Sequence, residues 1–194
     1  LGTAENKYPS LTGYIGEPTI NIAIMLLIIV GGIGFLTWDD IYTNKWHFKK
    51  YRMQSKVILV TTTILIIAPA VFFFFCDFTG LPLAERILAS LFQSVTPRTA
   101  GFNTADLPAM TGSSKAIMIL LMLVGGSPGS TAGGMKTTTL AVLILSAFSV
   151  CRKKDDAEVC GRRIDGSAVK NAATVAVMYF LLFFVGGIVI STAE

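Results

Sequence analysis

Long apolar blocks, separated by short polar and basic segments, restrict the fold of this chain more than any other feature. Blocks of this kind cover 19–38, 57–76 and 168–191, and a longer apolar run covers 116–150. A helix of about 20 residues crosses the ~30 Å hydrocarbon layer of a bilayer. Hydrophobic residues make up 53% of the chain and charged residues 14%, which is too apolar for an ordinary soluble domain. We therefore predict an all-α, multi-span membrane protein with about four spans.

The basic residues are unevenly distributed between the polar segments. Lys and Arg cluster in 39–56 and 151–167, whereas 1–18 and 77–115 hold few of them. Because cytoplasmic loops carry an excess of Lys and Arg, both basic segments are predicted to be cytoplasmic loops and the other two to lie outside. The net charge of +4 then reflects orientation in a membrane. We expect membrane lipid as a partner and no nucleic acid.

The residues after the second span predict a re-entrant loop. Pro82 begins a short amphipathic helix pattern over 83–95, and about a dozen residues are too few to cross a bilayer. The polar segment 96–104 follows. Backbone that is not helical is tolerated at membrane depth only where it is buried in protein or lines an aqueous cavity. We therefore predict that 83–95 is a pore helix and 96–104 an ion-selectivity filter.

The candidate filter residues are Thr99, Ala100, Gly101, Phe102 and Asn103. The C-terminal end of the pore helix would direct partial negative charge into the membrane, which favours a cation. Gly101 can adopt a positive φ, and a potassium ion would be held by the backbone carbonyls of Thr99, Ala100 and Gly101. A cation lining the pathway would repel its cargo, so Arg98 is expected to form a salt bridge behind the filter, and a role in biasing ion entry is the alternative. The alternative is that 96–104 is an external loop with a turn.

A second irregular segment interrupts the apolar run 116–150, which as one helix would be about 52 Å long. Its middle holds the ten residues Gly125, Gly126, Ser127, Pro128, Gly129, Ser130, Thr131, Ala132, Gly133 and Gly134. Discontinuous spans mark ion or substrate sites in transporters. We predict two half-helices joined at mid-membrane depth by a mobile gating loop, 125–134. A kinked helix with packing glycines is the alternative.

Lys136, directly after this loop, is predicted to reach toward the cytoplasm or to pair with a carboxylate, and a role as a gate charge is a third alternative. The stretch does not match a nucleotide-binding P-loop, because Met135 separates Gly134 from Lys136 and no buried strand precedes it. An enzyme is not expected, since the chain has one histidine and no carboxylate cluster inside a span. A non-conducting membrane assembly subunit is a further alternative, but it would leave both irregular segments unexplained.

Several stretches resemble the Trk/Ktr/HKT superfamily of potassium transporters, and its Ktr-type or Trk-type membrane subunit most of all. They are the residues 94–104, 125–137, and 31–35 followed by 39–41. The resemblance covers essentially the whole chain. Gly31, Gly32 and Gly34 are also residues that allow a neighbouring helix to approach closely.

The resemblance implies that the chain is an internal fragment of a subunit built from four span–pore-loop–span repeats. The implied parts are 1–38 as the tail of the second repeat, 57–150 as the complete third repeat with its first span at 57–76, and 168–194 as the first span of the fourth. It places the filter glycine at Gly101 and the gating loop at 125–134. Ala132 stands where many relatives have glycine.

The resemblance also implies potassium uptake across the plasma membrane of a prokaryotic cell. The implied partners are a second copy of the full-length subunit, in a homodimer, and a cytosolic nucleotide-binding regulatory ring. No covalently bound cofactor is implied; potassium is the transported ion, with sodium as a candidate coupling or activating ion in a symport. Sodium-selective or mixed monovalent cation transport is the alternative that the residues leave open.

Overall fold

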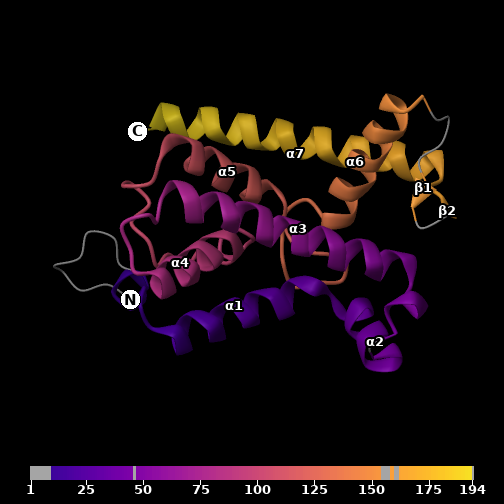
Figure 1. The fold of residues 1–194 in the computed structure, drawn as a ribbon. Coiled ribbons are helices and arrows are strands. Elements are labelled where there is room, and N and C mark those ends of the chain that lie inside the picture. Colours follow the sequence, from indigo (N-terminus) through magenta and orange to yellow (C-terminus); the bar gives the residue numbers. More distant parts are fainter. Residues whose placement is uncertain (1–9, 46, 154–157, 160–161, 194) are drawn as a thin grey trace.

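The chain folds almost entirely into helices, as a computed structural model describes for residues 10–45, 47–153, 158–159 and 162–193 (Figure 1). The α-helices are α1 (Pro18–Ile33), α2 (Phe35–Asn44), α3 (Met53–Cys76), α4 (Leu83–Val95), α5 (Gly112–Leu123), α6 (Thr137–Cys151) and α7 (Gly166–Ala193). The other elements are the 3₁₀-helices η1 (Thr12–Tyr14) and η2 (Phe48–Lys50) and an antiparallel pair of short strands, β1 (Glu158–Val159) and β2 (Arg162–Arg163). The prediction of an all-α fold is therefore confirmed, apart from the two short strands β1 and β2. Residues 1–9, within the predicted segment 1–38, and 154–157 and 160–161, within 151–167, lie outside the described residues.

Helix α3 is the central element of the structure. It packs against α1, α2, α4, α5 and α6, while α7 packs on α6 along one side (Figure 1). Among the described helices, α3 and α7 are each long and apolar enough to cross a membrane, and α1 with α2 passes the same test as one bent pair. Helices α5 and α6 are apolar but shorter. The third predicted span is thus divided into two helices.

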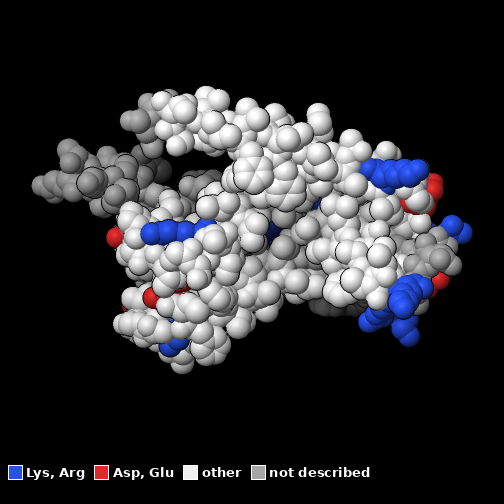
Figure 2. Space-filling view, turned by 90° about the horizontal axis from the view of Figure 1, so that it is seen from above, with Lys and Arg blue, Asp and Glu red and all other residues white. Residues whose placement is uncertain are grey.

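The outer surface of the helices is apolar, and charge is confined mainly to the ends. Only 6% of the apolar window of α7 is buried inside the structure. Figure 2 shows a broad surface without charged side chains and a group of Lys and Arg side chains at the end that carries β1 and β2 in Figure 1. Helix α2 and η2 lie at that same end (Figure 1). The two basic segments of the sequence therefore lie at one end of the molecule.

The residues predicted as a first span, 19–38, form a bent pair of helices. α1 ends at Ile33, α2 begins at Phe35, and their axes differ by 97°. Gly34 between them has φ 85° and ψ 148°, which is outside the helical region and accessible without strain only to glycine. The chain therefore turns sharply at Gly34. The sequence predicts that a neighbouring helix packs closely against Gly31, Gly32 and Gly34. In the structure, the segment that packs against Gly34 is the loop 125–134, described below.

At the opposite end, Asp77 joins the end of α3 to the start of α5. The backbone N–H of Thr111 donates to Oδ1 of Asp77 at 2.9 Å, and the hydroxyl of Ser114 donates to the other carboxylate oxygen. Thr111 is also the N-cap of α5 and accepts from the backbone N–H of Ser114 at 3.3 Å. These bonds satisfy N–H groups that have no partner inside the helix, and they fix α5 relative to α3.

Candidate functional site

The candidate filter begins in the buried interior, at the end of α4. This helix occupies the residues predicted as the short helix, 83–95, and it packs against α3 and α1. Phe92, Gln93, Ser94 and Val95 at its end are almost completely buried. The hydroxyl of Ser94 donates to the carbonyl of Leu91 at 2.8 Å, so it needs no partner outside the helix. The segment 96–104 therefore starts deep inside the protein and has to turn outward.

The turn is built on the carbonyl of Thr96, which accepts the backbone N–H groups of both Ala100 and Gly101 at 3.3 Å. Gly101 has φ 74°, as a glycine in such a turn can. Thr99 has φ 69°, which is unusual for a β-branched residue and strains the backbone. No sequence signal predicts this conformation, because threonine disfavours it. Strained residues of this kind are frequent at functional sites and persist only where their surroundings hold them.

The far side of the candidate filter is held by residues much earlier in the chain. The backbone N–H of Asn103 donates to the hydroxyl of Ser10 at 2.9 Å, and the N–H of Leu11 donates to the carbonyl of Asn103 at 2.8 Å. Inside the segment, the hydroxyl of Thr96 donates to the carbonyl of Phe102. Between these anchors, Thr99, Gly101 and Phe102 are exposed, and no atom lies within 4 Å of a Cβ built on Gly101. The backbone at Gly101 thus faces open space.

Arg98 does not form the expected salt bridge within the described part of the chain. Its side chain is buried, with 6% exposure, and its Nε atom has no hydrogen-bond partner among the described residues. The ion pairs found in that part of the chain both involve Arg52. The positive charge of Arg98 is therefore held below the surface, next to the candidate filter, without a neutralising carboxylate from the described residues.

The ten residues 125–134, which we call the glycine-rich loop, join α5 to α6 and are closed at their base. The backbone N–H of Gly125 donates to the carbonyl of Met135 at 2.9 Å, and the N–H of Met135 donates to the carbonyl of Leu123 at 3.2 Å. A Cβ at Gly125 would lie 1.6 Å from the carbonyl oxygen of Gly133. Only glycine fits there, because the two sides of the loop base approach so closely.

Lys136 contributes to the same closure. Its ammonium donates to the carbonyl of Ala132 at 2.8 Å, and in the described part of the chain no carboxylate lies within ion-pair distance of it. The predicted pairing with a carboxylate is therefore not formed there. Instead, Lys136 binds the loop that precedes it.

The tip of the glycine-rich loop contacts the bend between α1 and α2. We call residues 31–35 the α1–α2 hinge. Ser127, which is fully buried, donates its backbone N–H and its hydroxyl to the carbonyl of Gly32, both at 2.9 Å, and the hydroxyl also donates to the carbonyl of Ile33. A Cβ at Gly34 would lie 2.6 Å from the carbonyl oxygen of Pro128. At Gly34 the hinge and the loop therefore fit against each other with no space for a side chain.

Two further contacts extend this interface. The N–H and the hydroxyl of Thr131 donate to the carbonyl of Gly31 at 3.4 and 3.3 Å, and the N–H of Phe35 donates to the carbonyl of Gly129 at 3.3 Å. The last carbonyls of a helix have no partner inside the helix. In this structure the glycine-rich loop supplies donors to those of α1. The sequence does not predict this contact, because no local pattern in either segment indicates that the two segments pack together.

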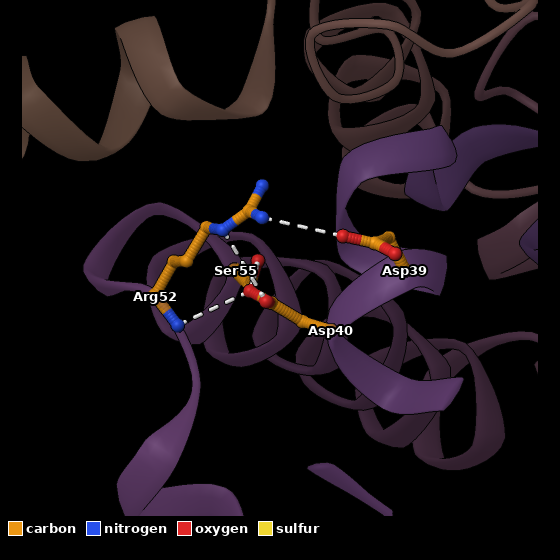
Figure 3. A network of polar contacts seen from close by, with 4 residues as sticks. All are labelled: Asp39, Asp40, Arg52 and Ser55. Atoms are coloured by element: carbon orange, nitrogen blue, oxygen red, sulfur yellow. Dashed lines mark hydrogen bonds and ion pairs between the residues drawn. The ribbon is translucent and has the colours of Figure 1, made fainter. Parts of the chain in front are cut away.

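A polar network fixes α2 to the start of α3 (Figure 3). One carboxylate oxygen of the buried Asp40 accepts the backbone N–H of Arg52 at 3.1 Å and the hydroxyl of Ser55 at 2.5 Å. The Arg52 guanidinium lies 3.5 Å from the other oxygen of Asp40 and 3.2 Å from Asp39. A carboxylate is favourable at the N-terminus of a helix, where the backbone N–H groups have no other partner. The angle of α2 is thus set by Asp40.

Comparisons with known proteins agree with this architecture. The family model described as TrkH, cation transport protein, matches residues 7–194. The chain is 32% identical, over 95% of its length, to the Ktr system potassium uptake protein B of Bacillus subtilis, of which it covers 43%. It is 38% identical, over 89% of its length, to the potassium/sodium uptake protein NtpJ of Enterococcus hirae, of which it covers 39%.

Among solved structures, the potassium transporter TrkH from Vibrio parahaemolyticus matches 92% of this chain with a TM-score of 0.73 and 20% sequence identity, which shows a shared fold. The match covers 40% of that chain, so the present chain spans about two fifths of the length of the relatives it matches. The family transports cations across the plasma membrane and is not a class of enzymes. The chain belongs to the TrkH family of cation transport proteins, together with the Ktr potassium uptake proteins.

Proposed function

We propose that this protein takes up potassium, or a related monovalent cation, across the plasma membrane through a pore lined in part by 96–104. The observation that carries the proposal is the backbone turn at Thr99 and Gly101. It follows a buried helix end, has positive φ angles at both residues and leaves Gly101 beside open space. Backbone carbonyls can replace the hydration shell of a cation in such a turn. The carbonyls of Thr99, Ala100 and Gly101 are our candidates.

The repeat architecture belongs to the same proposal. In it, α3 is the first span of a repeat, α4 and 96–104 form the re-entrant pore loop, and α5 and α6 together form a broken second span. The lengths of the helices support this, because α5 and α6 are each too short to cross alone. The end at which both basic segments gather would face the cytoplasm. The other carbonyls of a complete filter would come from further repeats.

The glycine-rich loop is proposed as the gate of this pore. Its closed base and its contacts with the α1–α2 hinge support a defined closed position. Regulation is proposed to come from a cytosolic nucleotide-binding ring that acts on a homodimer of the complete subunit, with sodium as a candidate coupling ion.

Rubidium uptake tests the proposal. Cells that lack their own potassium uptake systems would express the complete subunit that contains these residues. Gly101→Ser should change the rate or selectivity of uptake at normal membrane abundance, since a side chain strains a backbone with φ 74°. The matched control is Gly80→Ser: nothing lies within 4 Å of a Cβ there either, and its φ is not positive. Equal uptake by the two variants would rule out the filter assignment.

Competition by sodium distinguishes the two cation classes. The names of the relatives include both a potassium uptake protein and a potassium/sodium uptake protein, so mixed selectivity is the second candidate. An excess of potassium should abolish rubidium uptake, and an equal excess of sodium should leave most of it. Equal inhibition by both ions would favour the mixed transporter, and no uptake above the empty cells would favour a non-conducting assembly subunit.

A further inference from the structure

We propose that Ser127 is a positioning residue that holds the glycine-rich loop closed on the α1–α2 hinge, and that a change in the bend of the hinge releases the loop. The inference rests on the proposed role of this loop as a gate. It concerns how the closed position is held, and it comes from the contacts between two segments that lie about 95 residues apart.

The hinge and the loop compete for the same backbone groups. In a continuous α-helix the N–H of Phe35 would bond to the carbonyl of Gly31, four residues earlier. In this structure the N–H of Phe35 donates instead to the carbonyl of Gly129, while Thr131 donates to the carbonyl of Gly31. A straight helix and a docked loop therefore exclude each other. Each arrangement satisfies the same carbonyl with a different donor.

The contact at Ser127 has a large energetic effect because Ser127 and Ile33 are shielded from water. A backbone carbonyl without a partner inside a membrane protein costs several kcal/mol. The carbonyls of Gly32 and Ile33 both accept from Ser127, whose exposure is 0%. If the loop left while the hinge stayed bent, these carbonyls would lose their donor. Release of the loop is therefore coupled to a change in the hinge.

The glycines at the contact make the fit tight enough for this coupling. A Cβ at Gly126 would lie 2.6 Å from the Cβ of Ala132 and 3.0 Å from the carbonyl oxygen of Gly32. Any side chain at Gly126 or Gly34 would thus force the loop away from the hinge. Beside the contact, a cavity of about 330 Å³ lined by Val30, Phe35 and Trp38 provides space for a rearrangement of the bend.

The cytoplasmic end is connected to the hinge through α2. Because Asp40 binds Arg52 and Ser55 at the start of α3, it fixes the angle at which α2 leaves the hinge (Figure 3). Trp38 adds a second restraint, since its indole N–H donates to the carbonyl of Val30 across the bend at 3.0 Å. A force on α2 would therefore be transmitted to the hinge. A force applied to α2 at the cytoplasmic end would therefore release the loop even though the force does not act on the loop itself.

The test measures loop release directly in the complete subunit. Ser130→Cys, in a background whose natural cysteines are replaced by serine, reports exposure of the loop through its rate of labelling by a thiol reagent, because the Ser130 hydroxyl is buried in the docked loop and has no hydrogen-bond partner among the described residues. In this background Ser127→Ala should raise the labelling rate about 5- to 30-fold. This is the change in the ratio of released to docked loop that follows when the docked state loses about 1–2 kcal/mol of stability. The matched control is Thr63→Ala, which removes a hydroxyl that bonds to Leu59 within α3, at 2.8 Å and away from the hinge.

Two outcomes would overturn the inference. Equal labelling rates for Ser127→Ala and Thr63→Ala would show that Ser127 does not hold the loop. Loss of rubidium uptake by Ser127→Ala at normal abundance and with unchanged labelling would show that Ser127 serves conduction rather than closure. In either case the Gly101→Ser result still decides the proposed function separately.

Gly34→Ala provides the second test, should Ser127→Ala fail to reach the membrane. It disfavours the bent hinge, with φ 85°, and also displaces Pro128, so labelling should rise as well. An unchanged labelling rate would contradict the coupling between hinge and loop.

Discussion

The hydroxyl of Ser127 donates to the carbonyl of Gly32 at a distance of 2.9 Å, which connects the break in one pair of helices, α5 and α6, to the bend in another, α1 and α2. Each irregular segment supplies what the other lacks. The loop provides N–H and hydroxyl donors, and the end of α1 provides carbonyls that its own helix leaves unpaired. Both irregularities therefore belong to one structural unit.

The base of the glycine-rich loop should not tolerate a methyl group at Gly125. In Gly125→Ala the new Cβ would lie 1.6 Å from the carbonyl oxygen of Gly133, so the base has to open. We expect a drop in stability of about 1–3 kcal/mol, as for other overpacked sites. The thermal midpoint of the purified subunit in detergent measures this. Gly133→Ala is the control, because nothing lies within 4 Å of a Cβ there; an equal midpoint for both variants would contradict the described base.

Asp40 should matter more for stability than its neighbour Asp39. Asp40→Ala leaves the hydroxyl of the buried Ser55 and the N–H of Arg52 without their acceptor, at a cost of about 1–3 kcal/mol. Asp39→Ala removes only an exposed ion pair, which contributes about 0–1 kcal/mol. Chemical unfolding of both variants in detergent compares them. A larger loss for Asp39→Ala would contradict the network in Figure 3.

Thr99 should be replaceable by glycine with a gain in stability. Its φ of 69° costs a non-glycine residue about 1–2 kcal/mol, which Thr99→Gly relieves, less the entropy that glycine adds to the unfolded chain. Thr99→Val keeps the strain and loses the hydroxyl. We therefore expect the thermal midpoint to rise or stay level for the first variant and to stay close to the wild type for the second, because the exposed Thr99 hydroxyl makes no hydrogen bond among the described residues. A midpoint that falls more for glycine than for valine would show that Thr99 is not strained.

Local patterns in the sequence predict much of the helical architecture. Pro82 and the apolar pattern after it identify α4, and the glycines and Pro128 identify the break between α5 and α6. These features depend on residues close together in the chain, so they can be predicted from local sequence patterns. The roles of Gly101 in a filter and of 125–134 in a gate stay predictions that the uptake and labelling experiments address.

The other features depend on contacts between distant residues. The bend at Gly34 could not be predicted, because a span of that composition forms a straight helix unless something binds its free carbonyls, and Ser127 does so from elsewhere in the chain. The positive φ of Thr99 contradicts the preference of threonine, and it occurs in a segment whose far end is held by Ser10 and Leu11 through bonds to Asn103. Sequence patterns report local preference, and in both places tertiary contacts override it.

Cation flux into proteoliposomes decides whether the backbone at Gly101 selects the transported cation. The complete subunit would be reconstituted as wild type, as Gly101→Ser and as Gly80→Ser, and rubidium and sodium fluxes measured under the same gradient. We expect Gly101→Ser to lower the ratio of rubidium to sodium flux and Gly80→Ser to keep the ratio of the wild type. An unchanged ratio in Gly101→Ser, at equal amounts of reconstituted protein, would contradict the filter assignment.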